Sequence, residues 1–381
     1  MKRKIIILED SGPAGFGGGQ KVTMEVMRLA PPHAEILLID SSSSAAFFAQ
    51  ASELAQASLS LNSRYFFEYG AGNNFALTIK SLWRKIVKLP IDLIRIARFL
   101  KQNRAQGDEC TFYAPTKTGA VYGRLLSALW GGEFIFHAHN CYGTRSWLES
   151  LFTKYVISGA DKVVAVSDYV ASSLDLPAKT VRIYNPLTSS GGGEIARQFP
   201  EAGVIRIASC CSLIHYKGVE VFLDAAKLLA STPEQYEFVI IGDGPLKPDL
   251  QEKFSDYAHF LGAVIDVHEV LCGVDILVVP SIEPDAYSLV ITEAFGCGIP
   301  VIATNLGAHP ELVSDYQDGL LVEPDNPVAI CAAIQSIVRD HEMATRMQSN
   351  ALKKFEQFEQ GSFGDDIWMT LLGAQRRELR E

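Results

Sequence analysis

The sequence predicts an α/β protein built from two doubly wound domains, and three observations lead to this prediction. The chain has 381 residues, more than one ordinary domain of about 100–200 residues contains. Short apolar runs alternate with stretches of helical length, which is typical of parallel sheets covered by helices on both faces. Near the middle, this alternation is interrupted by a proline followed by serines and glycines, a composition that favours a linker.

The first half contains apolar runs that are continuous rather than alternating, as expected for strands buried on both faces of a parallel sheet. Helix-length stretches lie between several of these runs. The predicted strands are Ile5–Leu8, Glu35–Ile39, Phe134–His137, Val163–Val166 and Val181–Tyr184, and the predicted helices are Lys21–Leu29, Gly119–Leu129 and Trp147–Ile157.

The linker begins at Asn185-Pro186 and continues through Gly193, and the alternation restarts after it. Strands are predicted at Val204–Ser209, Glu237–Ile241, Ile276–Pro280 and Pro300–Thr304. One helix is predicted to begin at Gly218 and another to end at Phe295. We therefore predict an N-terminal domain over residues 1–190 and a C-terminal domain over residues 200–360. The helical segment 361–381 either caps the second domain or crosses back to the first.

The composition describes an ordinary globular protein, with 48% hydrophobic and 20% charged residues. A net charge of −10 argues against a nucleic-acid partner, because affinity for phosphate backbones depends on clustered Lys and Arg. Seven cysteines without a CxxC pair indicate a reducing compartment, and their spacing reveals no zinc cluster. The run Ile5–Leu8 is too short for a signal peptide, and no run reaches the roughly 18 apolar residues of a membrane span. We expect a cytoplasmic protein.

Residues 83–104 differ in charge from the chain as a whole, which is acidic, because this segment contains seven basic residues and the single acid Asp92. Apolar residues and Trp83 alternate with these charges, and Pro90 interrupts the pattern. A basic amphipathic stretch of this kind is typical of a helix that lies at a membrane surface. An ordinary surface helix with a solvated basic face is the alternative. The first interpretation would place the protein at the inner face of the membrane.

A glycine-rich loop, Gly15 to Gln20, follows the first predicted strand and precedes a helix. Glycines such as Gly17, Gly18 and Gly19 let backbone N–H groups approach an anion at a helix N-terminus. The loop lacks the spacing of a dinucleotide or P-loop motif. It therefore contacts a phosphate or sugar, or serves only as a flexible connection.

Two histidines, His137 and His139, lie at the end of a predicted strand. Their spacing of two puts both rings on one face of an extended chain, at the sheet edge where ligands of α/β folds bind. A neutral histidine that donates to a substrate hydroxyl is the favoured interpretation. A structural histidine is the alternative. A metal pair is disfavoured because no third ligand is evident.

A basic residue, Lys217, separates a strand end from a helix start, where its ammonium can meet a diphosphate. Further along, a strand ends at Pro280 and a helix begins near Ser288, so the N–H groups of Ser288, Leu289 and Val290 are available to an anion. Glu293 interrupts the apolar helix and suits ribose hydroxyls. Asp285, in the preceding loop, would face the transferred sugar. The alternative, that both acids are surface charges, does not explain Glu293.

The second half resembles the retaining, family-four glycosyltransferases of the GT-B fold, also known as group 1. The similarity is strong over about residues 204–340 and weaker over the first half. It rests on Lys217-Gly218-Val219, the segment Ile240–Pro245 that contains Gly242, Asp285–Glu293, Gly298–Thr304, Gly307–Val313 and Asp318–Val322, in the family's order.

The resemblance implies two Rossmann-like domains separated by a cleft and a transfer that needs neither metal nor cofactor and retains the anomeric configuration. By position, His139, with His137 as its neighbour, matches the histidine that reaches the transferred sugar, and Lys217 matches the basic residue on the diphosphate. Asp285 and Glu293 match the two acids of the E-x7-E pattern. The glycine loop matches the diphosphate and acceptor side, and Gly242 belongs to the same nucleotide-sugar site.

Two residues depart from the family pattern. Asp285 replaces the usual Glu and shortens its reach by one methylene. Ser212 stands where an Arg is usual, five residues before the lysine, and a hydroxyl cannot equal a bidentate guanidinium. The missing charge comes from His215 or another basic residue, or Lys217 acts with helix N-termini alone.

The sequence thus predicts a hexosyltransferase that moves a sugar from a nucleotide-diphosphate donor to a glycan. The basic segment favours a lipid-linked acceptor, as in the assembly of bacterial-type surface polysaccharides or glycolipids. One alternative is another GT-B enzyme, a nucleotide-sugar epimerase or a phosphorylase. The other is an inactive sugar-nucleotide-binding protein, which Ser212 makes conceivable.

Overall fold

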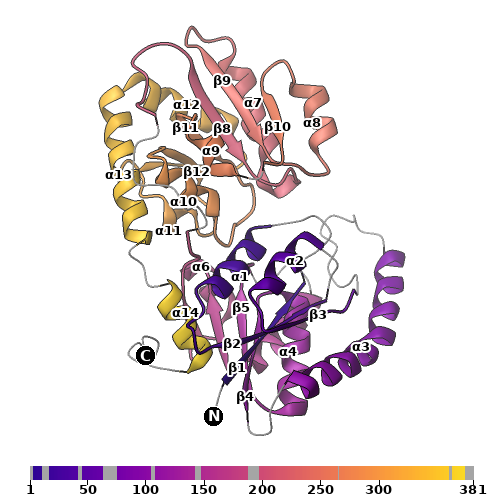
Figure 1. Cartoon of the computed structure of the whole chain (residues 1–381). Helices are drawn as coiled ribbons and strands as arrows, with labels where there is room; N and C mark the ends of the chain where they lie inside the picture. Colours follow the sequence, from indigo (N-terminus) through magenta and orange to yellow (C-terminus); the bar gives the residue numbers. More distant parts are fainter. Residues whose placement is uncertain are drawn as a thin grey trace. The chain divides into compact units, whose positions relative to one another are not determined.

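The computed structural model describes residues 3–10, 17–41, 45–62, 75–103, 108–141, 147–187, 197–264, 266–359 and 363–373. The chain forms two compact units (Figure 1). Unit 1 comprises residues 1–186 and 362–381, and unit 2 comprises residues 187–361.

Unit 1 contains, within its described residues, a seven-stranded parallel sheet in the order β3-β2-β1-β4-β5-β6-β7. The strand order reverses between β1 and β4, which makes this the point where a ligand crevice is expected in a doubly wound sheet. The strands are β1 (Arg3–Glu9), β2 (Glu35–Asp40), β3 (Ala57–Ser60), β4 (Glu109–Ala114), β5 (Glu133–Ala138), β6 (Lys162–Ala165) and β7 (Thr180–Arg182).

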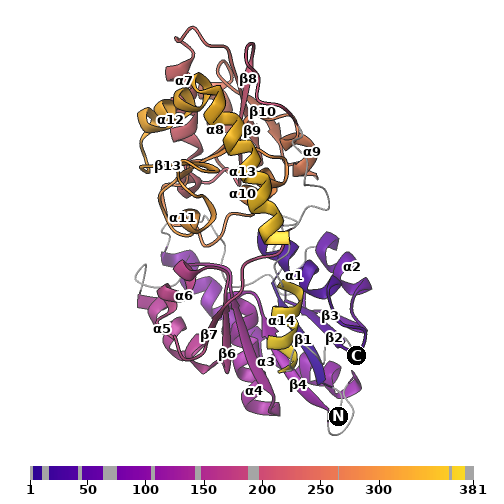
Figure 2. The same cartoon turned by 90° about the vertical axis from the view of Figure 1, so that its left-hand side faces the viewer.

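The helices of unit 1 connect these strands, and the last one comes from the C-terminal end of the chain. They are α1 (Gly18–Arg28), α2 (Ala45–Glu53), α3 (Phe75–Asn103), α4 (Lys117–Trp130), α5 (Trp147–Tyr155), the 3-10 turn η1 (Ile157–Gly159), α6 (Asp168–Leu174) and α14 (Phe363–Leu372). Helix α14 contacts α1, β1 and β4 (Figure 2). The buried indole of Trp368 donates to the Val26 carbonyl at 3.0 Å, which attaches this terminal helix to unit 1.

Unit 2 repeats the same plan, with a six-stranded parallel sheet among its described residues in the order β10-β9-β8-β11-β12-β13. Its strand order reverses between β8 and β11. The strands are β8 (Ile205–Cys210), β9 (Tyr236–Ile241), β10 (His259–Gly262), β11 (Ile276–Val279), β12 (Val301–Thr304) and β13 (Gly319–Val322).

The core of unit 2 forms where apolar side chains of the strands meet α7 and α12, which pack on each other. Helix α10 contacts β11, β12, α9 and α13. The helical elements are the 3-10 turn η2 (His215–Lys217), α7 (Val219–Leu229), α8 (Lys247–Phe254), α9 (Val267–Leu271), α10 (Leu289–Gly296), α11 (His309–Leu312), α12 (Pro327–Arg339) and α13 (His341–Glu359).

The predicted fold class is confirmed, since both units are parallel α/β sheets, and the predicted strands shift by only one or two residues at their ends. Four strands are missing from the prediction, namely β3, β4, β10 and β13. Each is short or carries polar residues, so its apolar run is weak. Pro90 lies inside α3, and the helix continues through it although proline removes one backbone donor.

Candidate functional site

Unit 2 brings together two of the predicted site residues at its strand-order reversal. Lys217 follows β8 and Asp285 follows β11, the two strands that flank the reversal. The Lys217 Nζ lies 2.5 Å from the Asp285 Oδ2, and the two side chains are 18% and 13% exposed. Two residues that are 68 positions apart in the chain therefore form a nearly buried ion pair at the edge where such sheets bind ligands.

Glycine explains how the Lys217 loop reaches this edge. Gly218 has a φ of +66°, and a Cβ at this position would lie 2.0 Å from the Pro280 carbonyl oxygen. The Ile282 N–H donates to the Tyr216 carbonyl at 2.9 Å. The loop after β8 thus lies directly against the loop after β11, and only glycine permits this approach.

The two charges of this pair stabilise each other. Burial would raise the pKa of Asp285, but the charge of Lys217, the nearby His309 ring and the hydrogen bond from Lys217 hold it well below its usual value. Burial would lower the pKa of Lys217, and the carboxylate of Asp285 raises it instead. Both groups are therefore charged at neutral pH. A diphosphate that approached Lys217 would meet a cation already held in position.

A third residue, His309, belongs to this group although the sequence assigned it no role. Its ring is fully buried, and its Nδ1 donates to the Thr304 carbonyl at 2.9 Å. Its Nε2 lies 3.8 Å from the Asp285 Oδ2. The backbone adds a further constraint, because the Ala308 N–H donates to the Asp285 carbonyl at 2.9 Å. The loop after β12 therefore determines the position of Asp285, a relation that residue spacing does not reveal.

Helix α10 carries the remaining predicted contacts of unit 2. Ser288 is its N-cap residue, and its side chain makes no capping hydrogen bond. Leu289 and Val290 form the first turn, whose N–H groups have no partner within the helix. Glu293 is 6% exposed within a run that is buried from Ile291 to Gly296. A carboxylate inside a buried helix is costly unless it binds a polar group.

Two other predicted residues of unit 2 differ in their surroundings. Ser212 is exposed in the loop after β8. Gly242 has a φ of +134°, and a Cβ there would lie 1.9 Å from the Cys211 carbonyl oxygen. The fold itself therefore requires glycine at position 242, whether or not a sugar donor binds there.

Unit 1 places both predicted histidines at the end of β5. The rings of His137 and His139 lie on the same side, with centroids 4.0 Å apart. His137 is fully buried, and its Nδ1 lies 2.5 Å from the hydroxyl of Tyr113 on β4. His139 is half-buried and lies one position past the end of β5. Of the two rings, His139 is the more accessible to a ligand.

Both histidines are held neutral. Burial lowers the pKa of His139 to about 4, and burial together with His139 places the pKa of His137 well below its usual value. The Nε2 atoms of both rings are buried and have no hydrogen-bond partner among the described residues. Buried polar atoms are nearly always paired, so these two atoms indicate a ligand or water at this edge.

The glycine loop is described only from Gly17, because residues 11–16 lie outside the described part of the chain. Gly17 is the N-cap of α1, and Gly18 and Gly19 begin the helix. Among the described residues, a Cβ on Gly19 would meet no atom within 4 Å, and one on Gly17 would meet only the Gln20 side chain. The described part of the fold therefore does not require glycine at Gly17 or Gly19. A close approach by a ligand would explain them.

A buried carboxyl, Glu9, adds an unexpected group to the same edge of unit 1. It ends β1 beside Asp40 of β2, and the Thr23 hydroxyl donates to its Oε2 at 2.7 Å. Burial raises the pKa of Glu9 to about 8. Thr23 also attaches α1 to the end of β1. The sequence shows Glu9 only as the residue that ends an apolar run, so its burial was not predicted.

The basic segment 83–104 lies in α3, and its side chains are described from Lys88. Arg95 does not belong to a free basic face, because its guanidinium donates to the carbonyls of Ser60 and Leu61 at the end of β3. Lys88, Arg98 and Lys101 are exposed on the same helix. Among the described residues, no helix combines the length and apolar character needed to cross a membrane.

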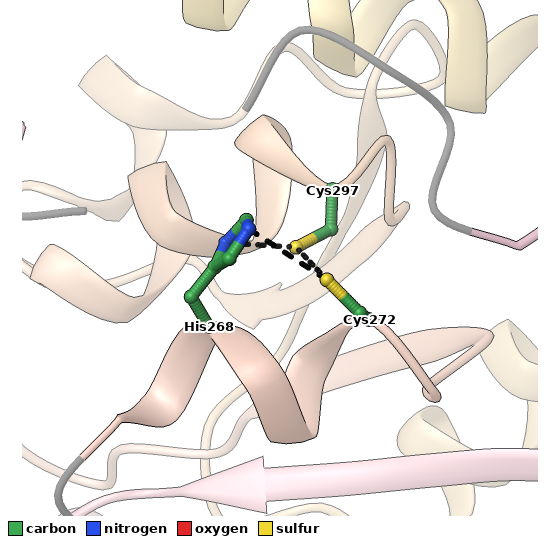
Figure 3. Close-up of side chains that lie close together, drawn as sticks. All are labelled: His268, Cys272 and Cys297. Carbon is green, nitrogen blue, oxygen red and sulfur yellow. Dashed lines mark hydrogen bonds between the residues drawn. The ribbon is translucent and has the colours of Figure 1, made fainter. Parts of the chain in front are cut away.

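Unit 2 also contains a group of side chains of the types that bind metals, which the residue spacing in the sequence did not reveal. His268, Cys272 and Cys297 lie with their donor atoms within 4.8 Å of one another (Figure 3). The cysteines are 25 residues apart, so no motif joins them, and only the contact between α9 and α10 brings them together.

Comparison with known proteins finds a family model that matches part of unit 2. Residues 205–340 match the family model described as glycosyl transferases group 1. An uncharacterized glycosyltransferase of Methanocaldococcus jannaschii is 27% identical over 215 residues, which are 54% of this chain and 58% of that protein. The α-1,3-N-acetylgalactosaminyltransferase of Campylobacter jejuni that acts on N,N'-diacetylbacillosaminyl-diphospho-undecaprenol is 26% identical over 148 residues, 38% of each chain. The chain therefore spans about half the length of these relatives.

A solved structure covers almost the whole chain. The Anabaena protein HepE in complex with UDP-glucose has a TM-score of 0.74, with 19% identity over 97% of this chain and all of that one. This likeness shows the fold. The fold class predicted from the sequence, GT-B with two Rossmann-like domains, is therefore confirmed, as is the predicted resemblance to group 1 glycosyltransferases.

Proposed function

We propose that this chain, whose residues 205–340 match the model of the group 1 glycosyltransferases, transfers a sugar, with retention of configuration, from a nucleotide-diphosphate donor to a glycan acceptor. Unit 2 would bind the donor. The observation that carries the proposal is the pair of Lys217 and Asp285 at the strand-order reversal, next to the N–H groups that begin α10, a helix without a side-chain cap.

The charges of unit 2 suit each part of such a donor. The ammonium of Lys217 and the N–H groups of α10 would hold the diphosphate, on which negative charge grows as the glycosidic bond breaks. The buried carboxylate of Glu293 would accept from the ribose hydroxyls. Asp285 would face the transferred sugar and keep Lys217 charged.

Unit 1 would contribute the neutral ring of His139 to the transferred sugar. Its low pKa, about 4, makes it a hydrogen-bond donor or acceptor rather than a cation at neutral pH. His137, held by Tyr113, would position it. The described part of unit 1 places no ionised carboxylate beside His139 that we would assign as a nucleophile. We therefore favour transfer on one face of the sugar, with the donor phosphate accepting the acceptor's proton.

Donor binding is the first test. Thermal-shift measurements with UDP, GDP, ADP and their sugars should give a rise in Tm for one nucleotide class. Glu293→Ala should remove most of that rise, whereas Glu220→Ala, which removes an exposed acid of α7, should preserve it. Binding that is unaffected by Glu293→Ala would contradict the assignment of the ribose site. Retention would be read from the anomeric configuration of the product by NMR.

The acceptor we propose is a lipid-linked glycan at a membrane surface. The exposed cations of α3 and its exposed Ile91 and Ile94 support this proposal, since together they resemble an interfacial helix. The relative from Campylobacter, whose substrate is an undecaprenol diphosphate, supports it further. Arg98→Glu with Lys101→Glu should weaken binding to anionic vesicles and leave neutral vesicles unaffected. Equal binding by variant and wild type would contradict a role of α3 at membranes.

A second candidate function is donor binding without transfer, and Ser212 is the observation that favours it. The hydroxyl of Ser212 is exposed in the loop after β8 and cannot replace a bidentate guanidinium. Ser212→Arg should then create or strongly increase transfer. A wild-type chain that already transfers sugar, with no gain from Ser212→Arg, would exclude this function.

A further inference from the structure

Three soft or borderline ligand atoms converge in unit 2. His268 and Cys272 are four residues apart at α9 and share one face of that turn. Cys297 is the C-cap residue of α10 and approaches from the opposite side (Figure 3). The two sulfur atoms are 3.5 Å apart, the His268 Nδ1 is 3.2 Å from the Cys297 Sγ, and the His268 Nε2 is 3.7 Å from the Cys272 Sγ.

These separations match the edges of a metal-binding tetrahedron. With Zn–S bonds of about 2.3 Å and Zn–N bonds of about 2.0–2.1 Å, tetrahedral ligands lie about 3.8 Å apart for two sulfurs and about 3.6 Å apart for sulfur and nitrogen. The sulfur–sulfur separation and the separation of the His268 Nδ1 from the Cys297 Sγ are within a few tenths of an ångström of these values. The 3.7 Å separation joins the other ring nitrogen, Nε2, to the Cys272 Sγ, so the imidazole must turn to direct one nitrogen at a cation between the two sulfurs.

We propose that His268, Cys272 and Cys297 bind a zinc-type divalent cation that ties α9 to the end of α10. Thiolates and imidazole are the ligand types that select such a cation over magnesium or calcium. Each cysteine would lose its proton to solvent as its metal–sulfur bond forms, and one coordination position would be taken by water. The role is structural, separate from sugar transfer.

The burial of the group suits such a site. Cys297 is 1% exposed, whereas His268 and Cys272 are half-buried. One ligand is therefore fixed in the core, and a cation can reach the other two from solvent. Cys297 also lies four residues after Glu293 on the same helix. A cation there would hold the end of the helix that carries the proposed ribose contact, and thereby reduce fraying of α10.

A disulfide between Cys272 and Cys297 is the rival, because their sulfur atoms are close. One feature favours the cation. A disulfide leaves no role for the His268 ring, which lies against both sulfur atoms.

The test uses the full-length chain, reduced and freed of metal, titrated with Co²⁺ and then Zn²⁺. The wild type should bind a single equivalent of Co²⁺ with the charge-transfer absorption of thiolate ligands, and Zn²⁺ should displace it. Saturating Zn²⁺ should raise Tm by about 5–10 °C, as expected for a ligand at roughly 100 times its Kd on a domain of this size. Cys272→Ser and His268→Gln should each weaken binding by more than about 100-fold, because even the loss of a residue that only orients a ligand costs 10–100-fold.

Cys331→Ser is the matched control, because Cys331 is a half-buried cysteine of the same unit that contacts the Ala225 carbonyl instead. It should keep the cobalt spectrum and the rise in Tm. The proposal is overturned if the wild type shows neither signal. It is also overturned if Cys272→Ser binds like Cys331→Ser, or if a Cys272–Cys297 disulfide forms in air even when Zn²⁺ is present. Donor binding, measured separately by the nucleotide thermal shift, should persist in Cys272→Ser.

Discussion

Replacing Lys217 by methionine tests whether the ion pair with Asp285 holds the donor loops together. The substitution keeps most of the side-chain volume and removes the charge. It leaves the Asp285 carboxylate, which is 13% exposed, without its cation. The nearest other partner is His309, whose Nε2 is 3.8 Å from that carboxylate. We expect a large loss of stability in unit 2 and loss of donor binding.

The magnitude follows from the burial of the pair. Removing one partner of a buried pair costs about 3–5 kcal/mol because it leaves an uncompensated charge. The two side chains are not fully buried, at 18% and 13% exposed, so we expect the lower end, about 3 kcal/mol. At about 2–4 °C per kcal/mol for a domain of this size, Tm should fall by about 6–12 °C.

The dependence of Tm on pH provides a second test of the same substitution. The pKa of Asp285 is depressed, so in the wild type its contribution to stability is complete above the unfolded value of about 3.9 and is lost as the pH falls below it. Without Lys217, burial raises that pKa instead. The difference in Tm between wild type and variant should therefore shrink as the pH is lowered from 7 to 5.

Two variants serve as controls in thermal unfolding followed by circular dichroism. Adding Asp285→Asn to Lys217→Met removes both charges and should recover most of the lost stability. Lys253→Met breaks an exposed pair of the same unit, at 3.1 Å with side chains 60% and 48% exposed, and should change the stability little. A double variant as unstable as Lys217→Met, or a Lys217→Met loss no larger than that of Lys253→Met, would refute the reasoning.

Two further predictions concern unit 1. Because burial raises the pKa of Glu9 to about 8, its protonated form contributes stability that is complete below the unfolded value of about 4.3 and is lost as the pH rises through 8. Glu9→Gln should therefore raise Tm at pH 8 and change it little at pH 4, and equal effects at both pH values would contradict the burial argument. Gly19→Ala should keep or raise Tm, because its Cβ meets no described atom within 4 Å and alanine favours helix by about 0.5–1 kcal/mol. It should nevertheless slow sugar transfer. Gly119→Ala, whose Cβ would lie 2.0 Å from the Leu8 carbonyl oxygen, should instead lower Tm, and unaltered transfer by Gly19→Ala would exclude a ligand at the loop.

The fold class and the family resemblance could be predicted from local patterns in the sequence, because these patterns follow from local physical requirements. Strands buried on both faces must be apolar throughout, so Ile5–Leu8 and Ile276–Pro280 are visible as runs without any partner being known. Backbone geometry requires the glycine of the short motif Lys217-Gly218, because a Cβ on Gly218 would lie 2.0 Å from the Pro280 carbonyl oxygen. Strands such as β4, Glu109–Ala114, escape detection because polar residues dilute their apolar signal.

Relations between distant segments depend on the tertiary structure, because contact between them leaves no local pattern. The sequence by itself determined that Lys217, Asp285 and Glu293 follow strand ends in a parallel α/β fold. Packing of the loops after β8, β11 and β12 decided that Lys217 pairs with Asp285 and that the buried ring of His309 lies close to the Asp285 carboxylate. Burial likewise decided the charge states of Glu9 and His139, since a pKa depends on how far neighbouring atoms exclude water, and a linear sequence does not contain that quantity.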